Sequence, residues 1–405
     1  MKKKKLLYQF IFVSLIMFLL SSCTHFDEPG LINQPDQTYS ENPVITGITP
    51  SDSAVAGVRE IIIAGQNFSI DGKDTNWVYI GGKAAEIKSV SSSQLVVYRP
   101  VIFGNSLDIN VVIPSALSIA KVLKYKIEEP VIEFSDFSYQ HYTLTAFDVD
   151  NQENIYVGTH RALLKLAPNG IDLNEIAGSS TLGSAFNTFT DMKFGPGGYL
   201  YALVGRKDIY RLDPATGENN SYVTLPNNSD KLDFDANQNI YTGRRDGILV
   251  VNSDKTITST GKYDNIPIVE IRVLNGYLYT ASASTLWKNQ ILDDKGSLGD
   301  DETVVDISSI PSLSNCEISS FNMDNQGTVF LCLKNHPQYS IFVLENDGSV
   351  TPFYKADILP QSVDQIIYGS GRYMYLSRGL MVADSVRFYR MGMEHNGAPY
   401  LGRQE

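Results

Sequence analysis

Six segments in the C-terminal two-thirds of the chain repeat one pattern of apolar and polar positions. In each segment an apolar strand reaches a polar turn rich in Asp, Asn or Gly, and an apolar–aromatic pair then opens the returning strand. The spacings between the aromatic residues are 45, 40, 38, 51 and 45 residues. Repeats of about 40–50 residues with several strands each are typical of a β-propeller. Six copies therefore predict six blades, and their aromatic residues are Tyr156, Tyr201, Tyr241, Tyr279, Phe330 and Tyr375.

A different pattern occupies residues 43–127. Here short strands of alternating apolar and polar residues are separated by Gly, Asn and Asp turns about every 8–12 residues, which predicts a β-sandwich. The opening Ile45-x-x-Ile48-x-Pro50, the turn Gly65–Phe68 and the strand end Ile80–Ala85 resemble an IPT/TIG domain, which has an immunoglobulin-like fold. The resemblance implies a spacer or an interaction module, and nothing in these residues indicates catalysis.

The repeats themselves resemble NHL-type propellers, above all over Ile176–Gly217. Later repeats lack the Gly-rich outer segment, so no partner of NHL proteins is carried across. Because a propeller is a closed ring, either Val131–Phe134 or the tail near Pro399–Leu401 is expected to supply its last outer strand. The predicted fold is all-β, with an immunoglobulin-like β-sandwich followed by a six-bladed β-propeller over residues 128–405.

The beginning of the chain carries an export pattern. Lys2–Lys5 form a basic region, and the apolar stretch Leu6–Leu20 is too short for an ordinary membrane span. The sequence Leu-Ser-Ser-Cys that ends at Cys23 resembles a bacterial lipobox. Residues 1–22 are therefore expected to be a lipoprotein signal peptide and Cys23 the lipidated residue, with an ordinary cleaved signal as the alternative. Residues 23–42 are polar and rich in Pro and Asn, as in a flexible stalk.

The acidic residues just after the lipidated cysteine, Asp27 and Glu28, resemble the signal that sends lipoproteins of Bacteroidota-type bacteria to the outer cell surface. This predicts a lipid-anchored protein of the outer membrane that faces the cell exterior. Loss of residues 1–22 removes four lysines, so the net charge moves from −12 to −16. Such an acidic chain argues against nucleic acid and anionic lipid as general partners.

The motifs of common catalytic and metal sites are missing from the sequence. It has no CxxC, HExxH or GxSxG, so no metal, no cofactor and no catalytic residue is predicted. Besides Cys23 the chain contains only Cys316 and Cys332, on either side of the turn Asp324–Gly327. Strand register about this turn places Cys332 opposite residue 319, which argues against a disulfide.

The loops between the second and third strands of the blades gather on one face of a propeller, together with the segments that precede the inner strands. Five of these six loops carry a cation, although the chain as a whole is acidic. The candidate ligand-binding residues in these loops are His160, Arg161, Arg206, Arg244, Arg245, His336 and Arg378.

Acidic residues precede the inner strands on the same face, at Asp191, Asp230, Glu270, Glu317 and Asp364. Two interpretations are open. The acids and cations either pair around the channel mouth and bind nothing, or they form a polar cup that matches sugar hydroxyls or uronate carboxylates. The acids of the inner-strand turns, on the opposite face, are interpreted as turn residues; they are Asp148, Asp150, Asp235 and Asp324.

Aromatic side chains matter because a ring can pack against the apolar face of a sugar. His141 and Tyr142 precede the first inner strand, and Trp287 opens the third strand of the fourth repeat. These three are further candidates for ligand binding, and a core position is the alternative for Trp287. The aromatic residue that recurs in every repeat is interpreted as structural.

The combined architecture resembles the accessory lipoproteins that sit beside TonB-dependent transporters in polysaccharide-utilisation systems of Bacteroidota. This resemblance implies a surface protein that binds a glycan, with a transporter and its partner lipoproteins as further partners. Two alternatives remain open at this point. One is a protein–protein scaffold in an outer-membrane complex, and the other is a lactonase- or lyase-type propeller enzyme in which carboxylates hold a calcium ion.

Overall fold

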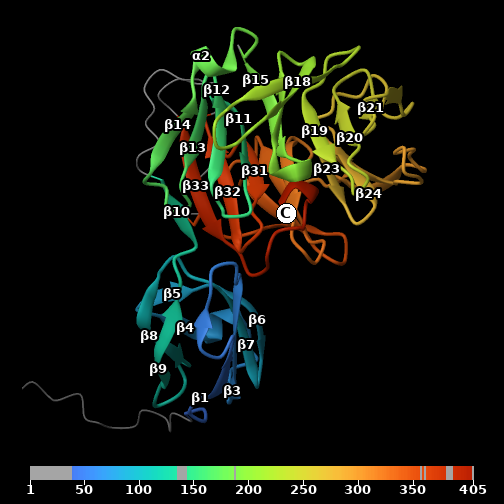
Figure 1. The fold of residues 1–405 in the computed structure, drawn as a ribbon. Coiled ribbons are helices and arrows are strands. Elements are labelled where there is room, and N and C mark those ends of the chain that lie inside the picture. Colours follow the sequence, from blue (N-terminus) through green and yellow to red (C-terminus); the bar gives the residue numbers. More distant parts are fainter. Residues whose placement is uncertain are drawn as a thin grey trace, which may run out of the picture.

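The computed structural model shows two all-β domains, with the sandwich below the propeller in Figure 1. It describes residues 39–134, 144–186, 188–355, 358–359, 362–379 and 386–403. Cys23, His141 and Tyr142, together with residues 1–22, lie outside the described residues.

The first domain is a sandwich of two sheets, with strand orders β1-β3-β7-β6 and β2-β9-β8-β4-β5. Alternate residues of β3, such as Ile61 and Ile63, are fully buried between the sheets, as the period of two predicts. The elements are β1 (Val44–Thr49), β2 (Ser53–Ala54), β3 (Glu60–Gln66), η1 (Lys73–Thr75), β4 (Trp77–Ile80), β5 (Lys83–Ala85), β6 (Ile87–Ser91), β7 (Gln94–Tyr98), β8 (Gly104–Val112) and β9 (Ala120–Ile127).

The second domain is a propeller of six four-stranded antiparallel blades, which confirms the predicted fold class. Blades 1 to 3 comprise β11 (Leu144–Val149), β12 (Ile155–Thr159), β13 (Leu163–Leu166), β14 (Leu173–Ala177), β15 (Phe189–Phe194), β16 (Leu200–Val204), β17 (Asp208–Leu212), β18 (Asn219–Thr224), β19 (Lys231–Phe234), β20 (Ile240–Gly243), β21 (Ile248–Val251) and β22 (Ile257–Ser259).

The later blades follow the same plan. Blades 4 to 6 comprise β23 (Glu270–Leu274), β24 (Tyr277–Ala281), β25 (Thr285–Gln290), β26 (Glu302–Asp306), β27 (Glu317–Met323), β28 (Val329–Lys334), β29 (Ile341–Leu344), β30 (Val350–Pro352), β31 (Gln365–Tyr368), β32 (Tyr373–Arg378), β33 (Arg387–Gly392) and β10 (Val131–Glu133). Among the described residues of this domain, three short helices lie in the connections, α2 (Ser179–Leu182), η2 (Pro196–Gly198) and η3 (Ile307–Ser309), and η4 (Leu401–Arg403) lies in the C-terminal tail.

The ring is closed by the N-terminal side of the domain. Strand β10 pairs with β33, so the first of the two expected closures is the one observed. The C-terminal tail instead crosses one end of the central channel. Gly397 forms an isolated bridge with Asp324 of blade 5, and Gly402 lies against the backbone of Phe194 in blade 2.

The recurring aromatic residue packs several blades against the next one. Tyr156 meets Phe194 at a ring-centroid distance of 5.1 Å, and Tyr201 meets Phe234 at 4.9 Å, both edge to face. Such pairs contribute about 0.5–1.5 kcal/mol beyond their area burial. The repeat therefore has a structural origin, because the recurring ring packs against an aromatic ring of the next blade in blades 1, 2 and 5.

Strand register also decides the state of the two described cysteines. In the β27–β28 ladder the residue opposite Cys332 is Ser320. Cys316 and Cys332 are both free and buried, in agreement with the sequence prediction that they do not pair.

The sandwich contacts the propeller at blades 5 and 6. Arg59 forms a salt bridge of 2.7 Å with Glu345, and the backbone N–H of Gly57 donates to the Tyr354 hydroxyl at 2.7 Å. Helix α2 and the loops between second and third strands lie at the end of the propeller that points away from the sandwich (Figure 1). The face selected from the sequence is therefore the distal face of the molecule.

Candidate functional site

The distal face contains one cluster of the predicted cations. Asp230 lies between two loops and forms a salt bridge with each, with 3.0 Å from its Oδ1 to Nε of Arg206 and 2.8 Å from its Oδ2 to Nε of Arg244. Arg206 has a positive φ of 68° after the glycine that turns the chain, which directs its side chain back toward blade 3. Exposed Arg245 follows directly in the chain. Two guanidinium groups on one carboxylate leave a net positive charge at this rim.

The cluster combines the two sequence interpretations. Acid and cation do pair, as the first interpretation states, yet the side chain of Arg206 remains 51% exposed. Among the described residues, Asp230 is the one carboxylate that pairs with either guanidinium group. Guanidinium groups held in place in this way can donate two parallel hydrogen bonds to an oxygen-rich ligand.

Three other predicted cations lie in loops of blades 1 and 6. His160 and Arg161 are exposed in the turn after β12, and Arg378 is exposed at the end of β32. None of the described salt bridges joins these three residues to Asp230, Arg206 or Arg244, so they do not form part of that cluster.

The His336 side chain is hydrogen-bonded within its own turn. Its Nδ1 accepts hydrogen bonds from the backbone N–H groups of Gln338, at 3.2 Å, and Tyr339, at 3.1 Å. An imidazole nitrogen that accepts must be unprotonated. Burial lowers the pKa of His336 below its usual value of 6.5, which also favours the neutral ring. The ring is therefore a neutral cap for the loop.

Trp287 packs between blades. Its ring is half-buried, and its centroid lies 5.2 Å from that of Tyr263 in the segment before β23. This geometry matches the core alternative given for Trp287 in the sequence.

Two of the acids predicted to precede the inner strands lie on those strands, β15 and β23, and are interior residues. Asp191 is 1% exposed and Glu270 is 2% exposed. Asp191 lies 3.3 Å from Nζ of Lys193, and Glu270 lies 3.4 Å from Nζ of Lys231. Burial lowers the pKa of Lys231, but the adjacent carboxylates outweigh it and the net shift is upward, so the lysine is held charged. These acids form part of a buried ionic network and not of an open cup.

The same channel acids join consecutive blades. Asp148 accepts from the backbone N–H of Phe194 at 2.8 Å, and Asp191 accepts from that of Leu232 at 3.0 Å. Asp148 was interpreted as a turn residue, and the structure corrects this, because it is buried on β11 and bonds to blade 2. The turn interpretation holds for Asp150, Asp235 and Asp324, whose Oδ1 atoms accept from backbone N–H groups two and four residues further on.

A buried arginine fills the middle of the channel. Arg272 is 1% exposed, lies 3.8 Å from Oδ2 of Asp233, and stacks 3.8 Å from the ring centroid of Tyr400. Burial raises the pKa of Asp233, and Arg272 opposes that rise. The Tyr400 hydroxyl donates to Oδ1 of Asn322 at 2.9 Å. The C-terminal tail thus seals the channel at the end nearer the sandwich.

The channel carboxylates already have partners supplied by the chain. Lys193, Lys231 and Arg272 lie beside them, and backbone N–H groups of neighbouring blades occupy their oxygens. No group of three or more His, Cys, Asp or Glu side chains in the described parts of the chain is placed to hold a metal ion.

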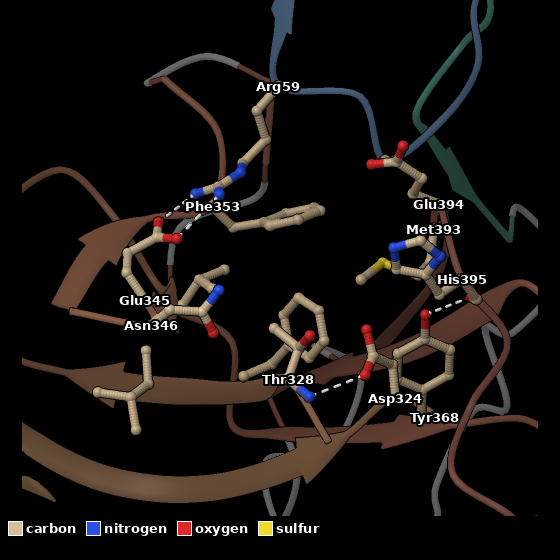
Figure 2. Close-up of a pocket in the computed structure, with 14 residues that line it drawn as sticks. Arg59, Asp324, Thr328, Glu345, Asn346, Phe353, Tyr368, Met393, Glu394 and His395 are labelled. Atoms are coloured by element: carbon tan, nitrogen blue, oxygen red, sulfur yellow. Dashed lines mark hydrogen bonds and ion pairs between the residues drawn. The ribbon is translucent and has the colours of Figure 1, made fainter. Parts of the chain in front are cut away.

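A further candidate site is a cavity at the junction of the domains (Figure 2). Sequence reasoning missed it. A cavity of about 190 Å³ is lined by Arg59 of the sandwich and by blade 5 and the C-terminal tail. It adjoins a larger cavity of about 700 Å³ along the same interface. Arg59 and Glu345 are 286 positions apart, and no motif links such segments in the sequence.

The comparisons with known proteins agree with this architecture. Residues 43–125 match the IPT/TIG family, so the sandwich is an IPT/TIG domain. No curated protein matches the chain. Among the described residues, no helix is both long and apolar enough to cross a membrane.

Two solved structures represent the fold. An auxiliary nutrient binding protein from Bacteroides thetaiotaomicron is 11% identical, with a TM-score of 0.52 over 88% of this chain and 98% of its own. Regucalcin from Agrobacterium tumefaciens, a calcium-binding protein, is 14% identical, with a TM-score of 0.51 over 66% of this chain and 95% of its own. At these identities the likeness shows the fold alone. The first structure spans both domains, and the second corresponds in extent to the propeller.

Proposed function

We propose that this protein is a surface-anchored binding protein that assists nutrient uptake, and that its propeller holds a glycan on the distal face. The observation that carries the proposal is the Arg206–Asp230–Arg244 cluster, an oriented cationic group on the face that points away from the sandwich. Guanidinium groups suit the vicinal hydroxyls and carboxylates of acidic sugars.

The remaining parts of the chain fit this task. A lipid on Cys23 and a stalk over residues 23–42 would tether the protein to the outer membrane, and the IPT/TIG domain would raise the propeller above it. A structural neighbour that spans both domains is named an auxiliary nutrient binding protein, which supports the same class of function. In this proposal a TonB-dependent transporter and its lipoproteins are the protein partners.

The channel gives the enzyme alternative little support. A lactonase- or lyase-type propeller would need carboxylates free to bind a divalent cation. Here Asp191 and Glu270 face Lys193 and Lys231 at salt-bridge distance. Because these lysines already neutralise the channel carboxylates, the two acids are not free to bind a divalent cation. We therefore prefer binding to catalysis as the function of the propeller.

The proposal predicts that replacing Arg206, Arg244 and Arg245 together by Ala abolishes glycan binding. The chain from residue 24 onward is run in native gels that contain neutral or uronate-bearing polysaccharides. The wild type is expected to be retarded by a uronate-bearing polymer, and the triple variant is expected to migrate freely in the same gel. The cause is the loss of all three guanidinium groups at the rim.

A matched control removes three cations elsewhere: Arg211, Lys255 and Lys295 lie outside the distal loops. Replacing these three by Ala changes the net charge equally and should leave retardation intact. Equal binding by the Arg206, Arg244 and Arg245 triple variant and the wild type would exclude the distal rim as the site. Capture of a transporter without retardation by any polysaccharide would favour the scaffold alternative.

A further inference from the structure

The cavity at the domain junction is built from segments that only the docked domains bring together. It shares Gly57, Arg59, Glu345, Phe353 and Glu394 with the larger cavity beside it, so the two spaces are continuous along the interface. Pockets for small molecules occur preferentially at domain interfaces and measure about 300–1,000 Å³. The size and position of this space are those of a ligand pocket.

Two polar side chains in this cavity have no hydrogen-bond partner among the described residues. The amide of Asn346 comes from the loop between β29 and β30, and the carboxylate of Glu394 comes from the tail after β33. Both point toward the cavity in Figure 2, together with the ring of His395. The pocket thus offers an amide and a carboxylate that the fold itself does not use.

Other polar groups of the pocket are already engaged and hold its shape. Glu345 accepts from both Nη groups of Arg59, at 2.7 and 3.3 Å. Oδ1 of Asp324 accepts from the backbone N–H of Thr328 at 2.8 Å. These bonds fix the walls on both sides before any ligand arrives, which lowers the entropic cost of binding.

One wall of the pocket is apolar. Phe330 and Phe353 are each 4% exposed and Met393 is 1% exposed, and the ring of Phe353 borders the cavity in Figure 2. These buried side chains form an apolar floor and offer no ring face for stacking. The unpartnered amide and carboxylate match the hydroxyls of a sugar.

The charge of the pocket selects among sugars. In the smaller cavity, where Asn346 lies, the carboxylates of Asp324, Glu345 and Glu394 outnumber the single guanidinium group of Arg59. The larger cavity adds three cations and two carboxylates: Lys88, Arg99, Lys355, Glu60 and Asp347. A uronate would be repelled in the smaller cavity, whereas the distal rim carries the opposite charge. We propose that the domain junction is a second glycan site, which binds a neutral sugar unit through Asn346 and Glu394. The choice of a glycan rests on the proposed function, and the position and charge preference rest on the pocket.

The test measures binding of neutral disaccharides by isothermal titration calorimetry, using cellobiose, maltose, mannobiose and xylobiose. The protein is the chain from residue 24 onward, and the key variant combines Asn346→Ala with Glu394→Gln. At least one disaccharide should bind the wild type, and the variant should bind it at least tenfold more weakly, since two hydrogen bonds are lost. The control combines Asn220→Ala with Glu218→Gln on blade 2 and should bind as the wild type does.

The outcomes separate this site from the distal rim. If the triple Arg variant keeps disaccharide binding and the junction variant loses it, the junction site stands, whatever the polysaccharide gels show. The proposal is overturned if no disaccharide binds the wild type, or if binding disappears with the three arginines and survives in the junction variant. Because either variant can lose affinity through misfolding, equal thermal unfolding midpoints of all four proteins are required first.

Discussion

His336 shows how a polar loop residue that looks available for a ligand can be consumed by its own turn. The two backbone N–H groups that its Nδ1 accepts belong to residues two and three positions further on, so the ring caps a local loop. Arg206 and Arg244 differ, because the partner they share is a carboxylate that leaves most of each guanidinium group unused. The distinction lies in side-chain geometry, which residue type does not reveal.

The cap makes stability depend on pH. Because burial holds the pKa of His336 below 6.5, the folded protein favours the neutral ring. This contribution is complete above about pH 6.5, the pKa in the unfolded chain, and is lost as the pH falls through that value toward the lower folded pKa. His336→Asn keeps an acceptor without a titrating group. Thermal unfolding at pH 7.5 and 5.5 should show a smaller pH effect in the variant, and an unchanged effect would contradict the role.

Blades are joined by carboxylates as well as by rings. Asp233 accepts from the backbone N–H of Val273 at 2.8 Å and faces the buried Arg272 of the next blade. The hydrogen bond from the backbone N–H of Phe194 to Asp148 joins blades 1 and 2 in the same way. Charged groups in a propeller channel can therefore serve cohesion between blades, since each inner strand offers N–H groups that its own blade leaves unused.

Removing one such carboxylate should be costly. Asp233→Ala leaves Arg272 without its facing carboxylate and the Val273 N–H without an acceptor, so we expect the free energy of unfolding to fall by about 3–5 kcal/mol. Asp233→Asn keeps an acceptor and should cost less. Denaturant unfolding measures both. Asp254→Ala, in an exposed turn, is the control and should change the stability much less than Asp233→Ala. Equal losses for Asp233→Ala and Asp254→Ala would refute the ionic role.

The two domains meet through close backbone contact as well as through side chains. Gly57 has a φ of 96°, and a Cβ at this position would collide with the backbone of Met393 and Glu394. The salt bridge between Arg59 and Glu345 lies beside this contact. Docking therefore depends on a glycine of the sandwich, whose missing Cβ lets the two backbones come this close.

Gly57→Ala should separate the domains while each stays folded. Small-angle scattering is expected to show a larger radius of gyration, and limited proteolysis should cut faster near Pro130, where the chain passes between the domains. Gly47→Ala is a suitable control, because nothing lies within 4 Å of the Cβ it would add. An unchanged radius for Gly57→Ala would mean that the junction tolerates the methyl group. Junction binding of a disaccharide should be lost with docking.

The sequence by itself determined the repeating parts of this protein. The apolar–aromatic pairs predicted six blades because five of the six recurring rings are buried core residues, as Tyr156 is against Phe194. The alternating strands predicted the sandwich, and register alone kept Cys316 and Cys332 apart. These features are local, so periodicity records them.

Only the tertiary structure decided which polar groups remain free for a ligand. Asp148 and Asp233 accept hydrogen bonds from the next blade. Asp230 forms salt bridges with two arginines, and Asn346 lines the cavity beside the sandwich. Each of these outcomes depends on contacts between segments tens to hundreds of residues apart, which closure of the ring and docking of the domains create. A period along the chain specifies the face that a residue occupies, but the partner across a blade or domain boundary is set by packing in three dimensions.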